Sequence, residues 1–78
     1  MMIQKHKFVE ANLEMLRKLT RNGYVSPKLL QYYNLYLNYM SIKKGQKINR
    51  YEIVSKETKQ SVRTVRRAVS EMKQYISN

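Results

Sequence analysis

Glycine and proline, the residues that most readily interrupt regular secondary structure, are rare in this chain. The 78 residues include two glycines and one proline. Between them, apolar residues recur at the i, i+3, i+4 and i+7 spacing of an amphipathic helix, and no hairpin signal is visible. The sequence therefore predicts an all-α fold, a small bundle of about four helices in a single domain over residues 1–78. Residues 5–44 would form two supporting helices, and residues 46–78 would form a second pair.

The two supporting helices have recognisable ends. The first is expected over about 5–22, where it stops before Gly23, because glycine tolerates the left-handed conformation at a helix C-terminus. The second is expected over about 27–44, with Ser26 as its N-cap. Pro27 fits the first helical position, because the N–H that proline lacks has no helical partner there.

The second pair consists of a short helix and a longer basic one. Asn49 is a candidate N-cap for the short helix, about 50–58, and Glu52 completes a capping box. Ser61 is the candidate N-cap of the longer helix, about 62–76. The apolar residues of the longer helix share one face: Val65, Ala68, Val69, Met72 and Ile76.

The segment LLQYYNLYLNYM, residues 29–40, is apolar or aromatic around nearly its whole circumference. Such a helix is either surrounded by other helices or in contact with another molecule. A chain this short buries only about 60% of its unfolded surface, so a dimer interface would add stability. Tyrosines can also stack on nucleic-acid bases, but the helical spacing and the absence of interleaved arginines favour core and dimer packing. We therefore predict a homodimer with contacts from Tyr32, Tyr33, Tyr36, Tyr39 and Met40.

Positive charge is concentrated in the second half of the chain. Sixteen lysines and arginines face five acidic residues, a net charge of +11, and residues 43–78 hold ten of the basic and three of the acidic groups. Such an excess predicts a polyanionic partner, with a merely solubilising surface as the alternative. Double-stranded DNA is favoured over RNA or a membrane surface. No aromatic platform for RNA is evident, and the apolar helix faces are better used in packing against one another.

A short helix, a turn of about three residues and a longer basic helix make a helix-turn-helix, whose second helix fits the major groove of DNA. Residues 53–72 resemble the DNA-binding helix-turn-helix of GntR-type bacterial regulators. The matching residues are Val54, Ser61, Thr64, Val65, Arg66, Arg67, Ala68 and Val69. The turn departs from that family, since Thr58, Lys59 and Gln60 stand where Leu-Gly-Val is usual. The family's wing and effector domain have no counterpart in the 78 residues.

The resemblance implies roles for three of the matching residues. In that family the serine and threonine positions usually contact phosphates, which assigns Ser61 and Thr64 to phosphates, and the arginine after the valine usually reads bases, which assigns Arg66 to bases. Arg63 is a second base-reading candidate, because it lies near the start of the helix. The full set of expected DNA contacts is Arg50, Lys56, Lys59, Gln60, Ser61, Val62, Arg63, Thr64, Arg66 and Arg67.

The sequence does not favour an enzyme. It has no cysteine, and its single histidine, His6, is expected to be solvated near the N-terminus. The five carboxylates are scattered among basic residues, and neither a Gly-rich phosphate loop nor a metal-ligand spacing is present. We therefore expect no catalytic residue, metal, cofactor or small-molecule substrate. No apolar run is long enough to span a membrane and the N-terminus does not read as a signal peptide, so a cytoplasmic location is expected.

These features together predict a sequence-specific double-stranded DNA-binding protein, a small transcriptional regulator of a bacterial, phage or plasmid system. One alternative is an accessory DNA-binding protein of replication, partition or conjugation. Another is a small protein-interaction module or inhibitor of mobile-element origin, which the tyrosine-rich helix would serve.

Overall fold

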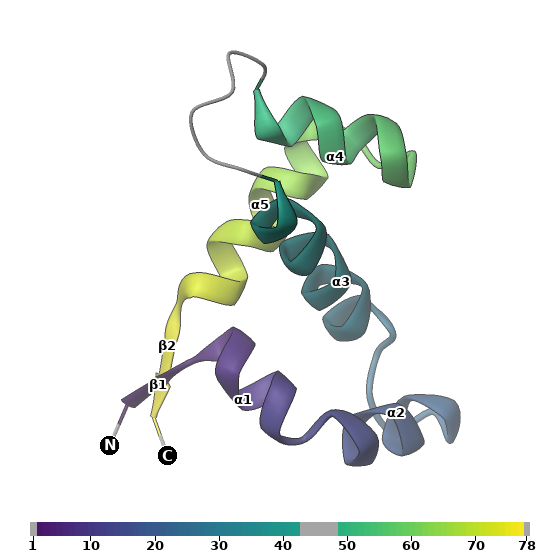
Figure 1. Cartoon of the computed structure of the whole chain (residues 1–78). Helices are drawn as coiled ribbons and strands as arrows, with labels where there is room; N and C mark the ends of the chain where they lie inside the picture. Colours follow the sequence, from purple (N-terminus) through teal and green to yellow (C-terminus); the bar gives the residue numbers. More distant parts are fainter. Residues whose placement is uncertain (1, 43–48, 78) are drawn as a thin grey trace.

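The computed structural model describes residues 2–42 and 49–77, which form five helices and two short strands (Figure 1). In chain order these are β1 (Met2–Gln4), α1 (Lys5–Ala11), α2 (Leu13–Arg21), α3 (Lys28–Ser41), α4 (Arg50–Thr58), α5 (Val62–Lys73) and β2 (Tyr75–Ser77). The predicted all-α fold is confirmed, and the C-terminal helices α4 and α5 follow each other in the predicted order. It differs from the prediction in a broken first helix and in the small sheet.

The first predicted helix, 5–22, is interrupted at Asn12. The Asn12 side chain donates a hydrogen bond to the Phe8 carbonyl at 2.9 Å, and its backbone N–H lies 3.2 Å from the carbonyls of both Phe8 and Val9. An asparagine side chain that bonds to nearby backbone groups competes with the helical ladder. The backbone of Asn12 (φ −118°, ψ 22°) leaves the helical region, and α1 and α2 run in different directions (Figure 1).

The predicted stop of this segment is confirmed, and α3 is close to its predicted extent. Gly23 has φ +79°, the left-handed conformation that favours glycine. α3 begins at Lys28, so Pro27 takes the N-cap position instead of the first helical one, and the Lys28 amide donates to the Ser26 hydroxyl at 3.2 Å. α3 ends at Ser41, and the last two residues of the predicted helix lie outside the described residues.

α5 ends three residues before its predicted end, and the chain continues as a strand. Gln74 is extended (φ −66°, ψ 149°), and β2 pairs antiparallel with β1, with Ile3 opposite Ile76. The Lys5 amide donates to the Gln74 carbonyl at 2.8 Å, which extends the pairing into the start of α1. Ile76 therefore belongs to this small sheet and not to the apolar face of α5. The sheet brings the two ends of the chain together (Figure 1).

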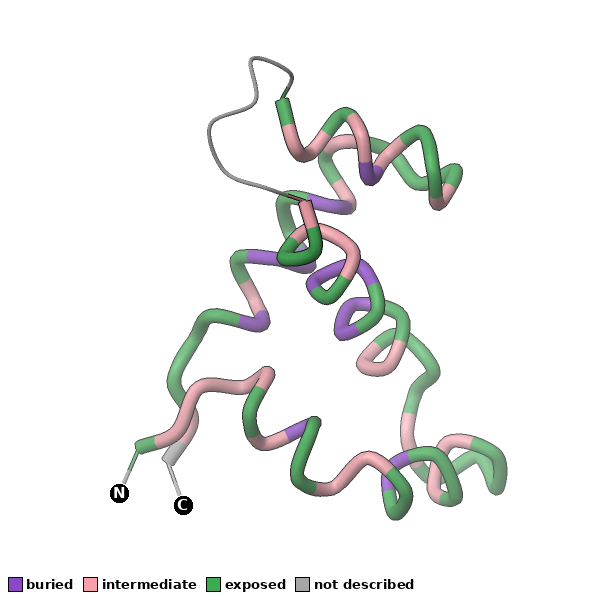
Figure 2. The backbone as a smooth tube through the Cα atoms, in the orientation of Figure 1, coloured by how far each residue is buried: buried purple, intermediate pink, exposed green. Residues whose placement is uncertain are grey.

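The core lies mainly where α3 faces α5 (Figure 2). α4 and α1 pack against the same pair of helices. The buried apolar residues are Val9, Leu16, Tyr32, Tyr33, Leu35, Tyr36, Val54, Val65, Ala68, Val69 and Met72. Four of the five residues predicted on the apolar face of α5 are among them. Each large apolar side chain contributes about 1.5–3 kcal/mol when it is removed from water, so α5 is firmly held by one side.

Within the described residues, every helix is too short or too polar to cross a lipid bilayer.

Candidate nucleic-acid interface

α4, a three-residue turn and α5 form the helix-turn-helix, which is described from Asn49 to Ser77 of the predicted unit 46–78. Both predicted N-caps are confirmed. The Asn49 side chain accepts a hydrogen bond from the Tyr51 amide at 2.8 Å. The Ser61 hydroxyl accepts one from the Thr64 amide at 3.1 Å.

The turn takes the conformation that a glycine would favour, although it contains none. Lys59 has φ 60° and ψ 24°, the left-handed region. Two side chains of α4 make hydrogen bonds here: the Ser55 hydroxyl donates across the turn to the Gln60 carbonyl at 2.5 Å, and the Thr58 hydroxyl donates to the Val54 carbonyl within α4 at 2.7 Å. The side chains before the turn therefore stabilise a backbone conformation that is unfavourable for lysine.

The exposed face of α5 carries the positive charge. Arg63, Arg66 and Arg67 are all exposed, and they lie opposite the buried residues of the helix, as predicted. Together with Ser70, Glu71 and Gln74 they line a shallow groove along the helix. A helix that is anchored by one face and free on the other can present these guanidinium groups to a partner without losing its own packing.

Glu71, the one acidic residue of α5, is neutralised from within the chain. Its carboxylate lies 2.7 Å from the Lys5 ammonium, at the start of α1. In the part of the chain that the structure describes, Arg63, Arg66 and Arg67 have no carboxylate within 4.0 Å. The arginines of α5 therefore retain their charge for an external anion.

Arg50, expected to contact DNA, has an internal role. Its guanidinium donates to the Tyr39 carbonyl at 2.8 Å and lies over the Tyr39 ring, with Cζ 4.0 Å from the ring centre. The Arg50 Nε is buried without a hydrogen-bond partner among the described residues. Because Tyr39 lies in the last turn of α3, Arg50 satisfies a carbonyl at the end of one helix and ties it to the start of the next.

The two hydroxyls assigned to phosphate by the resemblance are bonded to each other. The Ser61 hydroxyl donates to Thr64 Oγ1 at 2.9 Å, and Thr64 is half-buried.

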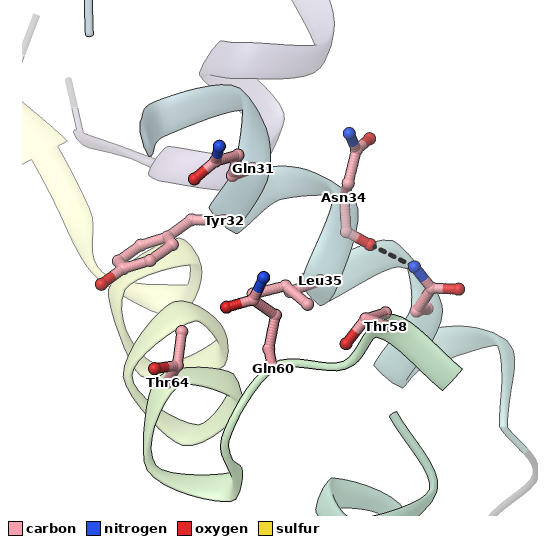
Figure 3. Close-up of a pocket in the computed structure, with 8 residues that line it drawn as sticks. Gln31, Tyr32, Asn34, Leu35, Thr58, Gln60 and Thr64 are labelled. Atoms are coloured by element: carbon pink, nitrogen blue, oxygen red, sulfur yellow. Dashed lines mark hydrogen bonds between the residues drawn. The ribbon is translucent and has the colours of Figure 1, made fainter. Parts of the chain in front are cut away.

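Gln60 and Thr64 lie beside α3, where they help to line a pocket of about 170 Å³ that the sequence did not reveal (Figure 3). The other lining residues are Gln31, Tyr32, Asn34, Leu35, Asn38 and Thr58.

The remaining expected contacts differ in their surroundings. Lys59 is exposed at the turn, whereas Val62 is half-buried. Lys56 is exposed on α4, but it shares a shallow depression with Glu52 and Glu57, which reduces the local positive potential. The strongest unopposed positive surface of the helix-turn-helix is therefore on α5 and at Lys59.

Most of the tyrosines expected at a dimer interface are buried within the protein itself. Tyr32, Tyr33 and Tyr36 are buried, each with less than a tenth of its surface exposed. Burial is the main cause that raises the pKa of Tyr33 above its ordinary value of 10.0. Met40 is the exposed member of the predicted set, and Leu37 is exposed one turn before it.

His6 is more enclosed than its position near the N-terminus suggested. Its ring stacks on Tyr36, with the ring centres 4.7 Å apart, and its Nε2 lies 3.0 Å from Gln4 Oε1. Desolvation lowers the pKa of His6 from 6.5, and the charge of Lys7 adds to this effect, while Glu10 opposes it. His6 therefore contributes to the packing of α1 against α3. The expectation that its ring is solvated is wrong.

One cluster was not foreseen from the sequence at all. Tyr39 and Tyr51 stack with ring centres 4.9 Å apart and planes at 25°. The Arg66 guanidinium lies over Tyr51, and the Lys73 ammonium lies over Tyr39. These four residues come from three different helices, so no local sequence pattern could have connected them.

Comparison with protein-family models, with curated proteins and with solved structures found no match to this chain, so the resemblance of residues 53–72 to GntR-type regulators stays a prediction.

Proposed function

We propose that this protein binds double-stranded DNA sequence-specifically, with α5 in the major groove. The observation that carries the proposal is the exposed face of α5. It holds three arginines without an acidic partner among the described residues, on a helix whose opposite face is buried. Twelve residues at 1.5 Å each give a helix of about 18 Å. A helix of that kind fits the major groove, and arginine forms paired hydrogen bonds with guanine there.

The net charge of +11 supports the same proposal. Lysines and arginines that neutralise phosphates release counterions, which supplies affinity for any duplex. Charge alone gives no sequence preference, so specificity is the part of the proposal that requires a test. The proposed role is transcriptional regulation, with an accessory role in replication, partition or conjugation as the alternative.

Pairing of two copies is part of the proposal. One helix-turn-helix reads few base pairs, and a two-fold dimer doubles the contacts. Leu37 and Met40, exposed in neighbouring turns of α3, offer apolar surface for this contact. The same two residues would serve a protein partner if the chain were an interaction module.

Selection of duplexes from a random-sequence library tests the function directly. We expect an enriched sequence that binds more tightly than its scrambled counterpart. Arg63→Ala and Arg67→Ala should reduce the affinity for the enriched duplex, while Arg21→Ala, at the exposed end of α2, should not. No enrichment, together with equal affinity for all duplexes, would show that the protein is not a sequence-specific DNA-binding protein. Sequencing of genomic fragments that the protein retains would then separate a promoter from a replication or transfer origin.

A further inference from the structure

Three cations converge on one pair of tyrosine rings. Arg50 and Lys73 lie over Tyr39, with Cζ 4.0 Å and Nζ 5.7 Å from the ring centre. Arg66 lies over Tyr51, with Cζ 5.3 Å from the ring centre. The two rings stack on each other at 4.9 Å. We call these five residues the tyrosine–cation cluster.

The cluster gathers like charges that repel one another. None of the three cations has a carboxylate within 4.0 Å among residues 2–42 and 49–77. The faces of the tyrosine rings attract the cations and compensate part of this repulsion. An anion close to the cluster would compensate more of it, and arginine binds phosphate through several N–H groups at once.

The three cations of the tyrosine–cation cluster differ in burial and therefore in role. Arg50 is half-buried, and its guanidinium is bonded to the Tyr39 carbonyl, so it fixes the rings from inside. Arg66 and Lys73 are exposed and available to a ligand. Tyr39 and Tyr51 are half-buried between them, and the ring of Tyr51 holds the Arg66 side chain against α4.

Arg66 therefore stands at the edge of the exposed face of α5 and not at its centre. With 3.6 residues per turn, Arg63 and Arg67 lie about 40° apart around the helix axis, and Arg66 lies about 60° from Arg63 on the other side. Lys73 lies only about 20° from Arg66 around the axis. When the centre of a helix face points to the floor of the groove, the side chains at its edge lie beside the sugar–phosphate backbone.

We infer that the tyrosine–cation cluster is a binding site for the phosphate backbone of DNA, with Arg66 and Lys73 as its ligands and Tyr51 as the positioning residue of Arg66. This inference rests on the proposed function and makes it more specific. It assigns base contacts to Arg63 and Arg67 and phosphate contacts to Arg66, in contrast to the base-reading role that the resemblance implied for Arg66.

The first experiment compares arginine variants on the enriched duplex and on its scrambled counterpart, over a series of salt concentrations. Arg66→Ala should lower the affinity for both duplexes by the same factor and reduce the slope of log affinity against log salt by about 0.9, the value for one phosphate. Arg67→Ala, the matched control one residue away, should lose more on the enriched duplex. A larger loss of Arg66→Ala on the enriched duplex would overturn the inference and leave the proposed function intact.

The second experiment tests Tyr51. Tyr51→Leu should weaken binding to both duplexes about two- to fivefold, the factor that corresponds to a cation–π contact near the surface. Tyr51→Phe keeps the ring and should bind like the wild type. In an Arg66→Ala background, Tyr51→Leu should cause no further loss, since no guanidinium remains to be positioned. Circular dichroism confirms that each variant is folded.

The outcomes separate the two claims. An equal loss from Tyr51→Leu with and without Arg66 would show that Tyr51 acts independently of Arg66, and the positioning role would be wrong. If no duplex is enriched and Arg63→Ala, Arg66→Ala and Arg67→Ala all bind like the wild type, the proposed function itself fails, and the phosphate site fails with it.

Discussion

The Lys5 ammonium lies 2.7 Å from the Glu71 carboxylate and joins the start of α1 to the last turn of α5. The two residues are 66 positions apart, and both are half-buried. The contact reinforces the neighbouring β1–β2 pairing. It also neutralises the one negative charge of α5, so its two partners affect stability and DNA binding differently.

Glu71→Gln and Lys5→Ala should have similar effects on stability and different effects on DNA affinity. Each removes the ion pair, so each should lower the free energy of unfolding by at most about 1 kcal/mol. Glu71→Gln raises the net charge and should strengthen binding to any duplex, whereas Lys5→Ala should not. Urea denaturation and affinity for a scrambled duplex measure the two effects. Equal affinities of the two variants would contradict a role of Glu71 in the potential of α5.

Lys59→Gly should not destabilise the protein, although it places a glycine between two helices. The left-handed conformation of Lys59 costs a side-chain residue about 1–2 kcal/mol, which glycine avoids. The matched control is Lys56→Gly, inside α4, which should lose about 1 kcal/mol. Both variants remove one positive charge, so urea denaturation separates the backbone effect from the charge. A Lys59→Gly protein less stable than Lys56→Gly would contradict this account of the turn.

Stability should decrease when the pH falls below about 6.5, and His6 should cause part of that decrease. The pKa of His6 is lowered from 6.5 in the folded state by burial, then by Lys7. Below pH 6.5 the unfolded chain therefore takes up a proton before the folded chain does, and the equilibrium shifts towards unfolding. Above pH 6.5 His6 is neutral in both the folded and the unfolded chain, so its contribution to the pH dependence of stability disappears.

The measurement is the thermal unfolding midpoint between pH 5 and pH 8. His6→Phe keeps a ring against Tyr36 and cannot titrate, so its midpoint should vary less with pH than that of the wild type in the acidic part of this range. If the unfolding midpoints of the two proteins depended on pH in the same way, protonation of His6 would not affect the stability of the fold.

The homodimer can be tested at the exposed surface of α3. Sedimentation of the wild type at micromolar concentration should show a dimer, and Met40→Lys should shift it towards the monomer by placing a charge in an apolar contact. Met15→Lys is the control, because Met15 is equally exposed on α2 (53%, against 48% for Met40). A wild type that sediments as a monomer with and without DNA would exclude the dimer.

The helices and their ends depend on residues close together in the chain, and here prediction from sequence was accurate. Asn49 and Ser61 bond to amides two and three residues away, and the bounds of α4 agree with the prediction. Gly23 ends α2 through its own backbone conformation. The buried face of α5 follows from helical periodicity as far as Met72. Such local interactions are present in the sequence itself, because the residues that make them lie within one or two turns.

The failures arise where local and distant interactions compete. The apolar pattern of residues 5–22 continues through Asn12, where the structure nevertheless ends α1. β1 and β2 are three residues each, too short to show a pattern, and each strand has its partner at the other end of the chain. α1 packs against α5 beside this pairing, so contacts between distant parts of the chain accompany it.

The sequence by itself determined the helical class, the short-helix–turn–long-helix order and the excess of positive charge. Tertiary structure decided which charges remain free. Arg50 and Arg66 look alike in the sequence, yet Arg50 is bonded to the Tyr39 carbonyl while Arg66 remains exposed. Tertiary structure also placed Tyr32, Tyr33 and Tyr36 in the core. The physical reason is that a side chain is free or occupied according to its neighbours in space, and those neighbours are known only when α3, α4 and α5 have packed together.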